Sequence, residues 1–101
     1  MTRRFVIKDE LGTDLSSRHS AAALRRAVLS AAECEPVAID LEGVRTLSDS
    51  FADEFFAVIV AEKGEDWFRR SIHVTGLAPQ VRRSILEAVR DRLNSQPAQT
   101  P

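Results

Sequence analysis

Five polar residues, Ser48, Asp49, Ser50, Asp53 and Glu54, gather hydroxyl and carboxylate groups in one short stretch of the chain. Serine and aspartate oxygens accept hydrogen bonds from the free N–H groups at a helix start, so the simplest chemistry here is helix capping. Ser50 and Asp53 have the spacing of a capping box, in which the serine caps the helix and the carboxylate returns to the serine N–H. The same oxygens could instead contact a partner protein or bind a divalent cation.

The elements around this cluster predict where it lies. Residues 36–41 form a short apolar, β-branched run typical of a buried strand, and Gly43 and the polar residues 48–50 then interrupt it. From residue 50 onward apolar side chains recur with helical spacing, at Phe51, Ala52, Phe55, Phe56, Val58, Ile59 and Val60. Open α/β sheets place their sites beyond the carboxyl ends of strands. We therefore expect an exposed polar corner between a central strand and a helix start.

The rest of the chain continues this alternation. Strands are predicted over 4–8 and about 71–74, and helices over 18–32 and 78–93, with a solvated turn at 63–66. The order β-α-β-α-β-α predicts a small single-domain α/β sandwich, with a short mixed or parallel sheet and helices packed on it. Three strands are few, so an extra strand before the first helix, or the edge of a partner in a homodimer, would complete the sheet. We expect one domain over 1–94 and a disordered tail over 95–101.

Bulk properties argue against several functions. A formal net charge of −1 gives no general attraction to nucleic acid or to an anionic membrane, and no apolar run is long enough to cross a bilayer. His19 and His73 lie too far apart for metal-ligand spacing, and the single cysteine cannot form an internal disulfide. Asp53 and Glu54 would point about 100° apart on a helix, with no nucleophile beside them. We expect a soluble cytoplasmic domain with no catalytic residues, no metal and no cofactor.

Charge is distributed unevenly along the chain. Between residues 40 and 66 there are eight acids against two basic residues, whereas residues 67–93 hold six arginines against two acids. This asymmetry fits either ordinary solvated faces or a charge-complementary partner surface. Trp67 and Phe68, which follow the acidic turn, also allow two interpretations. They fill the core under the sheet edge, or they form an exposed contact to a partner.

Two segments resemble one known family. Residues 40–55, DLEGVRTLSDSFADEF, resemble the central segment of STAS domains, the family shared by anti-anti-sigma factors and sulphate-transporter tails, where D-hydrophobic-x-G-V-x-x-hydrophobic-D-S-S-G is typical. Residues 74–86, VTGLAPQVRRSIL, are similar to the family's last strand-to-helix passage. The sequence of residues 50–54, SFADE, resembles more narrowly the group called STAS-like domains of unknown function. The resemblance covers roughly residues 37–93.

The resemblance implies a bacterial, non-catalytic signalling module that docks an anti-sigma or histidine-kinase-like ATPase through Ser48, Asp49, Ser50, Asp53 and Glu54. Alignment on Gly43-Val44 places Asp49 where phosphoregulated members have their phosphoacceptor serine. Ser50 and Ser48 are then the candidate phosphoacceptors, and Asp49 would imitate the phosphorylated state with less charge than a phosphoserine. The alternatives are a self-associating structural subunit and a small metal-dependent enzyme or ligand-binding subunit that uses the acidic loop.

Overall fold

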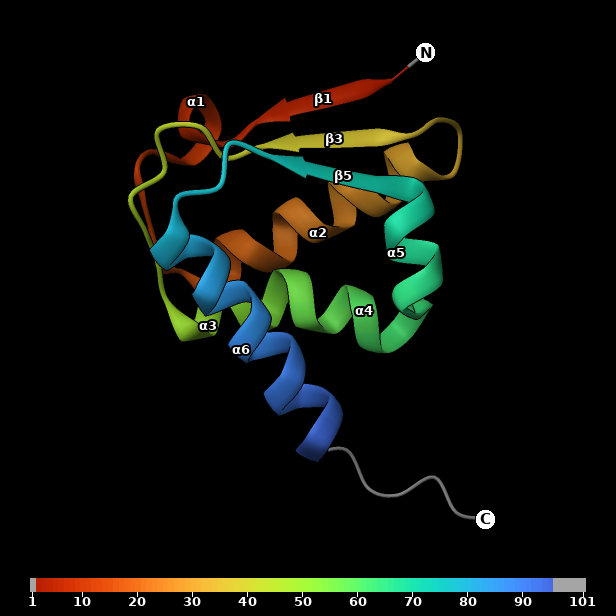
Figure 1. The fold of residues 1–101 in the computed structure, drawn as a ribbon. Helices are drawn as coiled ribbons and strands as arrows, with labels where there is room; N and C mark the ends of the chain where they lie inside the picture. The colour runs from red at the N-terminus through yellow and green to blue at the C-terminus, as the bar shows by residue number, and fades with distance from the viewer. Residues whose placement is uncertain (1, 96–101) are drawn as a thin grey trace.

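Three parallel strands form the main sheet of the computed structural model, which describes residues 2–95 of the chain. They are β1 (Arg3–Val6), β3 (Val37–Asp40) and β5 (Ile72–Thr75), in the spatial order β1-β3-β5 (Figure 1). Phe5, Ile39 and Val74 stand side by side in the register and point to the same face. The predicted alternation of strands and helices and the predicted α/β fold are thus confirmed.

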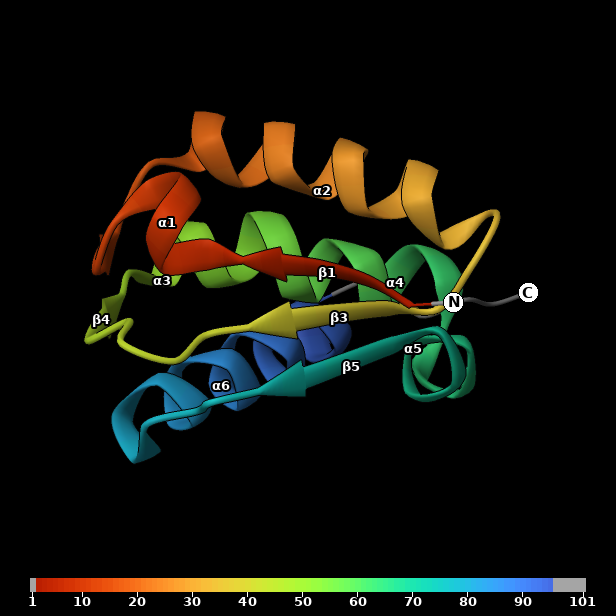
Figure 2. The same cartoon turned by 90° about the horizontal axis from the view of Figure 1, so that it is seen from above.

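The long helices all lie on one face of this sheet. They are α2 (Arg18–Ala32), a central run made of α3 (Asp49–Ala52), η1 (Asp53–Ala57) and α4 (Val58–Lys63), and α6 (Pro79–Ser95). Figure 2 shows the central run lying between α2 and α6, behind the strands. Of the predicted tail over 95–101, Ser95 is the last residue of α6, and the remainder lies outside the described residues.

The central run contains a π-helical turn at η1. Here the N–H of Val58 donates to the carbonyl of Asp53, five residues back, instead of to that of Glu54, four residues back. The turn therefore holds one residue more than an α-helix would need over the same length. It carries both Asp53 and Glu54.

Several short elements differ from the sequence-based expectations. The first strand ends at Val6, and α1 (Ile7–Leu11) follows at once because Ile7 turns into the core, where it is 1% exposed. The expected extra strand exists as β2 (Asp14–Leu15), but it pairs with β4 (Thr46–Leu47) in a separate two-stranded sheet. The turn predicted at 63–66 is confined to Gly64 (φ 95°), after which α5 (Glu65–Ser71) begins.

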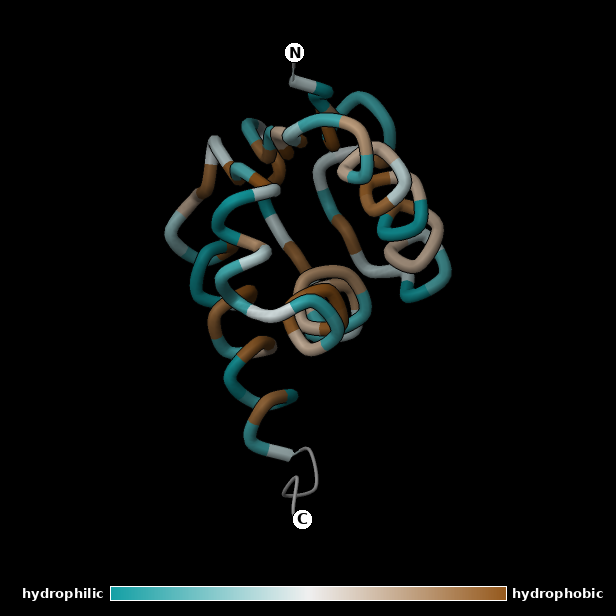
Figure 3. Tube along the Cα trace, turned by 90° about the vertical axis from the view of Figure 1, so that its right-hand side faces the viewer, coloured by the Kyte–Doolittle hydropathy of each residue, from teal (hydrophilic) through white to brown (hydrophobic). Residues whose placement is uncertain are grey.

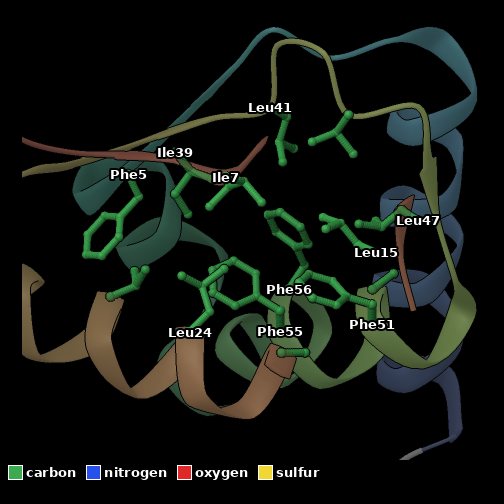
Figure 4. Close-up of a cluster of buried hydrophobic side chains, with 14 of the residues drawn as sticks. Phe5, Ile7, Leu15, Leu24, Ile39, Leu41, Leu47, Phe51, Phe55 and Phe56 are labelled. Atoms are coloured by element: carbon green, nitrogen blue, oxygen red, sulfur yellow. The ribbon is translucent and has the colours of Figure 1, made fainter. Parts of the chain in front are cut away.

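The core lies between the sheet and the central run. Phe51, Phe55 and Phe56 meet Leu24 of α2 and strand residues such as Ile39 (Figure 4). The rings of Phe55 and Phe56 pack edge to face, with centroids 4.6 Å apart. This aromatic centre fixes how the central run sits beneath the strands, and so where its N-terminus emerges.

Burial decreases along helix α6. Val81 is buried, Ile85 and Val89 are half-buried, and Leu93 is exposed. Leu93 is exposed because the C-terminal half of α6 extends past α4, away from the sheet (Figure 1).

Candidate functional site

Ser48 caps the helix at the polar corner. Its Oγ accepts a hydrogen bond from the N–H of Phe51 at 3.0 Å, and α3 begins at Asp49. Two contacts to the chain around β2 hold Ser48 in place: its N–H donates to the carbonyl of Leu15 at 2.8 Å, and its Oγ donates to that of Ser16 at 3.2 Å.

The predicted capping box is therefore wrong. Ser50 is the second residue of α3 and does not cap it, and Asp53 does not return to a cap. The corner also does not follow the middle strand directly, because β4 intervenes between β3 and Ser48.

Asp53 is held by arginines from two other helices. Arg92 of α6 donates Nε–H to Oδ1 at 2.7 Å and Nη2–H to Oδ2 at 2.8 Å, a bidentate pair. Arg18 of α2 donates to Oδ2 at 3.2 Å. The hydrogen bonds from Arg92, and then those from Arg18, lower the pKa of the Asp53 carboxyl.

Glu54 is held in a similar way by α2 alone. Arg25 donates to Oε2 at 2.8 Å and Arg18 to Oε1 at 2.9 Å, and these two arginines lower the pKa of Glu54, Arg25 more than Arg18. Arg25 also donates to the main-chain carbonyl of Glu54. That is the carbonyl which Val58 N–H bypasses in the π turn, so Arg25 stabilises both the side chain and the irregular backbone of the turn.

These contacts form an ion network of Arg18, Arg25, Arg92, Asp53 and Glu54, called here the arginine clamp. The two carboxylate side chains are only 24% and 20% exposed, so the clamp is partly shielded from water. Sequence reasoning missed its arginines, which lie 29 to 39 residues from the carboxylates that they bind. A weak signal existed, since Arg18 and Arg25 are seven residues apart and share one face of a helix.

Beside the clamp, and sharing two of its residues, the corner has a small acidic hollow. Asp49, Ser50 and Asp53 line it together with Arg18, and α6 contributes Glu87, Ala88 and Asp91 around a volume of about 270 Å³. Asp49, Glu87 and Asp91 are exposed, and Ser50 is half-buried. The structure thus brings the five predicted residues to one corner. Ser48 caps α3, Asp53 and Glu54 are clamped, and Asp49 and Ser50 line the hollow. Glu87 and Asp91 were not predicted.

The two segments that carry the family resemblance meet behind this corner. The N–H of Leu41 donates to the carbonyl of Thr75 at 2.8 Å, joining the ends of β3 and β5. Gly76 has φ 72°, and a Cβ atom there would lie 2.5 Å from the nitrogen of Glu42. The loops touch so closely that only glycine fits.

Asp40 stabilises the same junction from the end of β3. It accepts hydrogen bonds from Arg4 and, at 2.9 Å, from the N–H of Glu42. These two bonds, Arg4 first, lower the pKa of Asp40.

Two further findings concern the described part of the chain. Among residues 2–95, no three side chains of histidine, cysteine, aspartate or glutamate converge closely enough to hold a metal ion. Within the same residues, no helix has the length and apolar content that a membrane span requires.

A short parallel sheet with its long helices on one face defines a small α/β domain. The family model described as STAS-like domain of unknown function (DUF4325) matches residues 20–82, and the chain belongs to this family. The match includes Arg25 and residues 48–54, whereas Arg18, Arg92 and the α6 acids Glu87 and Asp91 lie outside it. No curated protein and no solved structure matches the chain.

Proposed function

We propose that this domain is a non-catalytic interaction module which docks a signalling partner through the corner formed by Ser48, Asp49, Ser50, Asp53 and Glu54. The observation that supports the proposal is that this corner has two parts. The arginine clamp holds two of its carboxylates in place, and the remaining acidic surface is exposed. Arg18, Arg25 and Arg92 hold Asp53 and Glu54, which supports a positioning role over acid–base catalysis. Asp49, at the first turn of α3, remains exposed beside the acids of α6.

The chemistry of this surface favours a partner that presents basic side chains. Around one hollow, Asp49, Glu87 and Asp91 carry three negative charges, and the two other charged residues, Arg18 and Asp53, pair with each other. Complementary charges speed encounter and select the correct partner. The resemblance to anti-anti-sigma factors suggests an anti-sigma or histidine-kinase-like ATPase, in a bacterial cytoplasm.

Between the two candidate phosphoacceptors, the contacts favour Ser50. The Oγ of Ser48 both caps α3 and donates to Ser16, so a phosphate there would break two contacts. A phosphate on Ser50 would leave the cap at Ser48 intact and would add negative charge to the hollow lined by Asp49, Glu87 and Asp91.

The test is a binding assay with a matched control. Asp49→Lys and Asp66→Lys both reverse an exposed acid in the first turn of a helix, of α3 and of α5, and each should change the free energy of unfolding by no more than about 1 kcal/mol. Immobilised wild type and Asp66→Lys should retain an ATPase from an extract of the source cells, whereas Asp49→Lys should lose it. Equal retention by both variants contradicts the proposal.

Two further measurements separate the alternatives. Incubation with the purified ATPase and ATP, followed by mass spectrometry, should show phosphate on the wild type and none on Ser50→Ala. A melting temperature that rises with Mg²⁺, and no longer does so in Asp49→Asn, would support the cation-binding alternative and contradict a purely protein-docking corner.

A further inference from the structure

A second surface lies on the opposite side of α6 from the acidic corner. Helices α4, α5 and α6 enclose an apolar groove of about 410 Å³ whose floor consists of Phe56, Val60, Phe68, Ile85 and Val89. We call it the α5–α6 groove. The corner uses Glu87 and Asp91 of α6. The groove uses residues on another face of the same helix, among them Leu86, Val89 and Leu93.

Two leucines on α6 leave the groove incompletely covered. Leu86 is 57% exposed and Leu93 is 37% exposed, and both line the groove. Leu86 also lines two adjoining hollows, one toward Leu77 and one toward Arg83. In Figure 3 the tube of α6 alternates between hydrophobic and hydrophilic segments down to its end beside the grey trace. Contiguous exposed apolar surface of this kind marks an interaction site more often than it marks a free surface.

The rim of the groove is basic. Arg82 and Arg83 of α6 flank its extensions. Arg69 and Arg90 flank the groove itself, where Arg69 pairs with Glu65 and Asp66 and Arg90 pairs with Asp91. Within residues 2–95, no carboxylate forms an ion pair with Arg82 or Arg83. A partner segment with an apolar stripe between acidic residues would complement this apolar floor and basic rim.

The same charges disfavour a second copy of this chain as the occupant. A two-fold dimer would place this patch against itself and would bring the α6 arginines toward one another. Like charges brought together at an interface are costly. A long groove between two helices fits the helix-in-groove mode, in which a partner helix inserts apolar residues at i, i+3 or i+4, and i+7.

We propose that the α5–α6 groove docks an acidic amphipathic helix of a partner protein, independently of the acidic corner. Leu86 and Leu93 would contact the apolar stripe of that helix, and Arg82 and Arg83 would pair with its acidic flanks.

The experiment selects peptides from a random display library, each long enough for about four helical turns. Peptides are selected on the wild-type domain and counter-selected on Leu86→Asp/Leu93→Asp. The enriched peptides should carry net negative charge and apolar residues at helical spacing. In fluorescence anisotropy, Leu86→Asp should weaken their binding about tenfold or more, and Arg82→Glu/Arg83→Glu should do the same.

Controls make the outcome decisive. Arg26→Glu reverses an exposed arginine on α2, and Asp49→Lys alters the acidic corner, so both should leave peptide affinity unchanged. The proposal is overturned if no peptide is enriched over the counter-selected variant, or if the enriched peptides are neutral or basic. It is also overturned if sedimentation shows a wild-type dimer that Leu86→Asp converts to a monomer, because a second copy would then cover the groove. If Leu86→Asp alters the circular dichroism melt, the charge-reversal pair carries the test.

Discussion

Arg92 grips Asp53 with two parallel hydrogen bonds, Nε to Oδ1 at 2.7 Å and Nη2 to Oδ2 at 2.8 Å, across 39 residues of sequence. The pair ties the last helix to the π turn of the central run. It lies close to the proposed docking surface, so the rigidity of that surface depends on it.

Removal of this tie should destabilise the fold measurably. Arg92→Ala leaves Asp53 with only the longer contact to Arg18, and we expect a loss of about 1 kcal/mol in the free energy of unfolding, since the pair is partly exposed. Urea denaturation measures it. Arg90→Ala, two residues earlier and more exposed, should cost under about 0.5 kcal/mol. Equal losses in the two variants would show that the bidentate pair contributes nothing.

The arginine clamp should also make stability depend on pH. Arg92 and Arg25, with Arg18, lower the pKa values of Asp53 and Glu54 in the folded state. The two carboxylates therefore stabilise the fold above their ordinary pKa values, about 3.9 and about 4.3. That contribution is lost as the pH falls through the lower folded-state values.

The variant Asp53→Asn/Glu54→Gln isolates this contribution. At pH 7 it should be less stable than wild type, and the difference should shrink as the pH falls below about 4. Urea midpoints at a series of pH values measure both. A difference that stays constant from pH 7 to pH 3 would mean that the amides disturb packing and that ionisation is irrelevant.

Helix capping at the corner should depend on one serine. Ser48→Ala removes the acceptor for Phe51 N–H and should cost about 1 kcal/mol of unfolding free energy. Ser50→Ala, inside the first turn of α3, should cost less than about 0.5 kcal/mol. A larger cost for Ser50→Ala would restore the capping box predicted from the sequence.

The contact between the two strand-end loops should tolerate no Cβ atom at Gly76. Gly76→Ala combines a positive φ with a 2.5 Å approach to the nitrogen of Glu42, so the loss should exceed the roughly 1–2 kcal/mol of conformational strain alone. Gly12→Ala is the matched control, because Gly12 also has a positive φ but a Cβ atom there would meet nothing within 4 Å. Thermal or urea unfolding of both variants gives the comparison, and similar losses would show that the loops can separate freely.

Local patterns in the sequence were sufficient to predict the main architecture. The β-branched run ending in Asp40 and the apolar spacing from Phe51 onward reflect burial against a sheet, and both elements form as predicted. Gly64 illustrates the limit: the local pattern predicts a longer turn around it, but a single residue with φ 95° suffices to separate α4 from α5.

The place of the polar corner was predictable, but its internal contacts were not. Ser48, Asp49 and Ser50 are all good caps, and the choice among them depends on contacts of Ser48 with Leu15 and Ser16 that no local pattern reveals. For the same reason Arg92 could not be paired with Asp53 in advance. Its neighbours Arg90 and Asp91 offered equally reasonable surface charges, and only the packing of α6 on the central run decides which one turns inward.

The additional residue in the π turn has a consequence for how this helix tolerates change in length. Deletion of one residue between Phe55 and Ala57 would let the chain continue as an uninterrupted α-helix. Because the π turn takes up the additional residue within a single turn, the segments before and after the deletion would keep nearly their present orientation about the helix axis. Asp53 would stay within reach of Arg92 and the cap at Ser48 would keep its place beside β2, while the carbonyl of Glu54 would accept a helical N–H in place of Arg25.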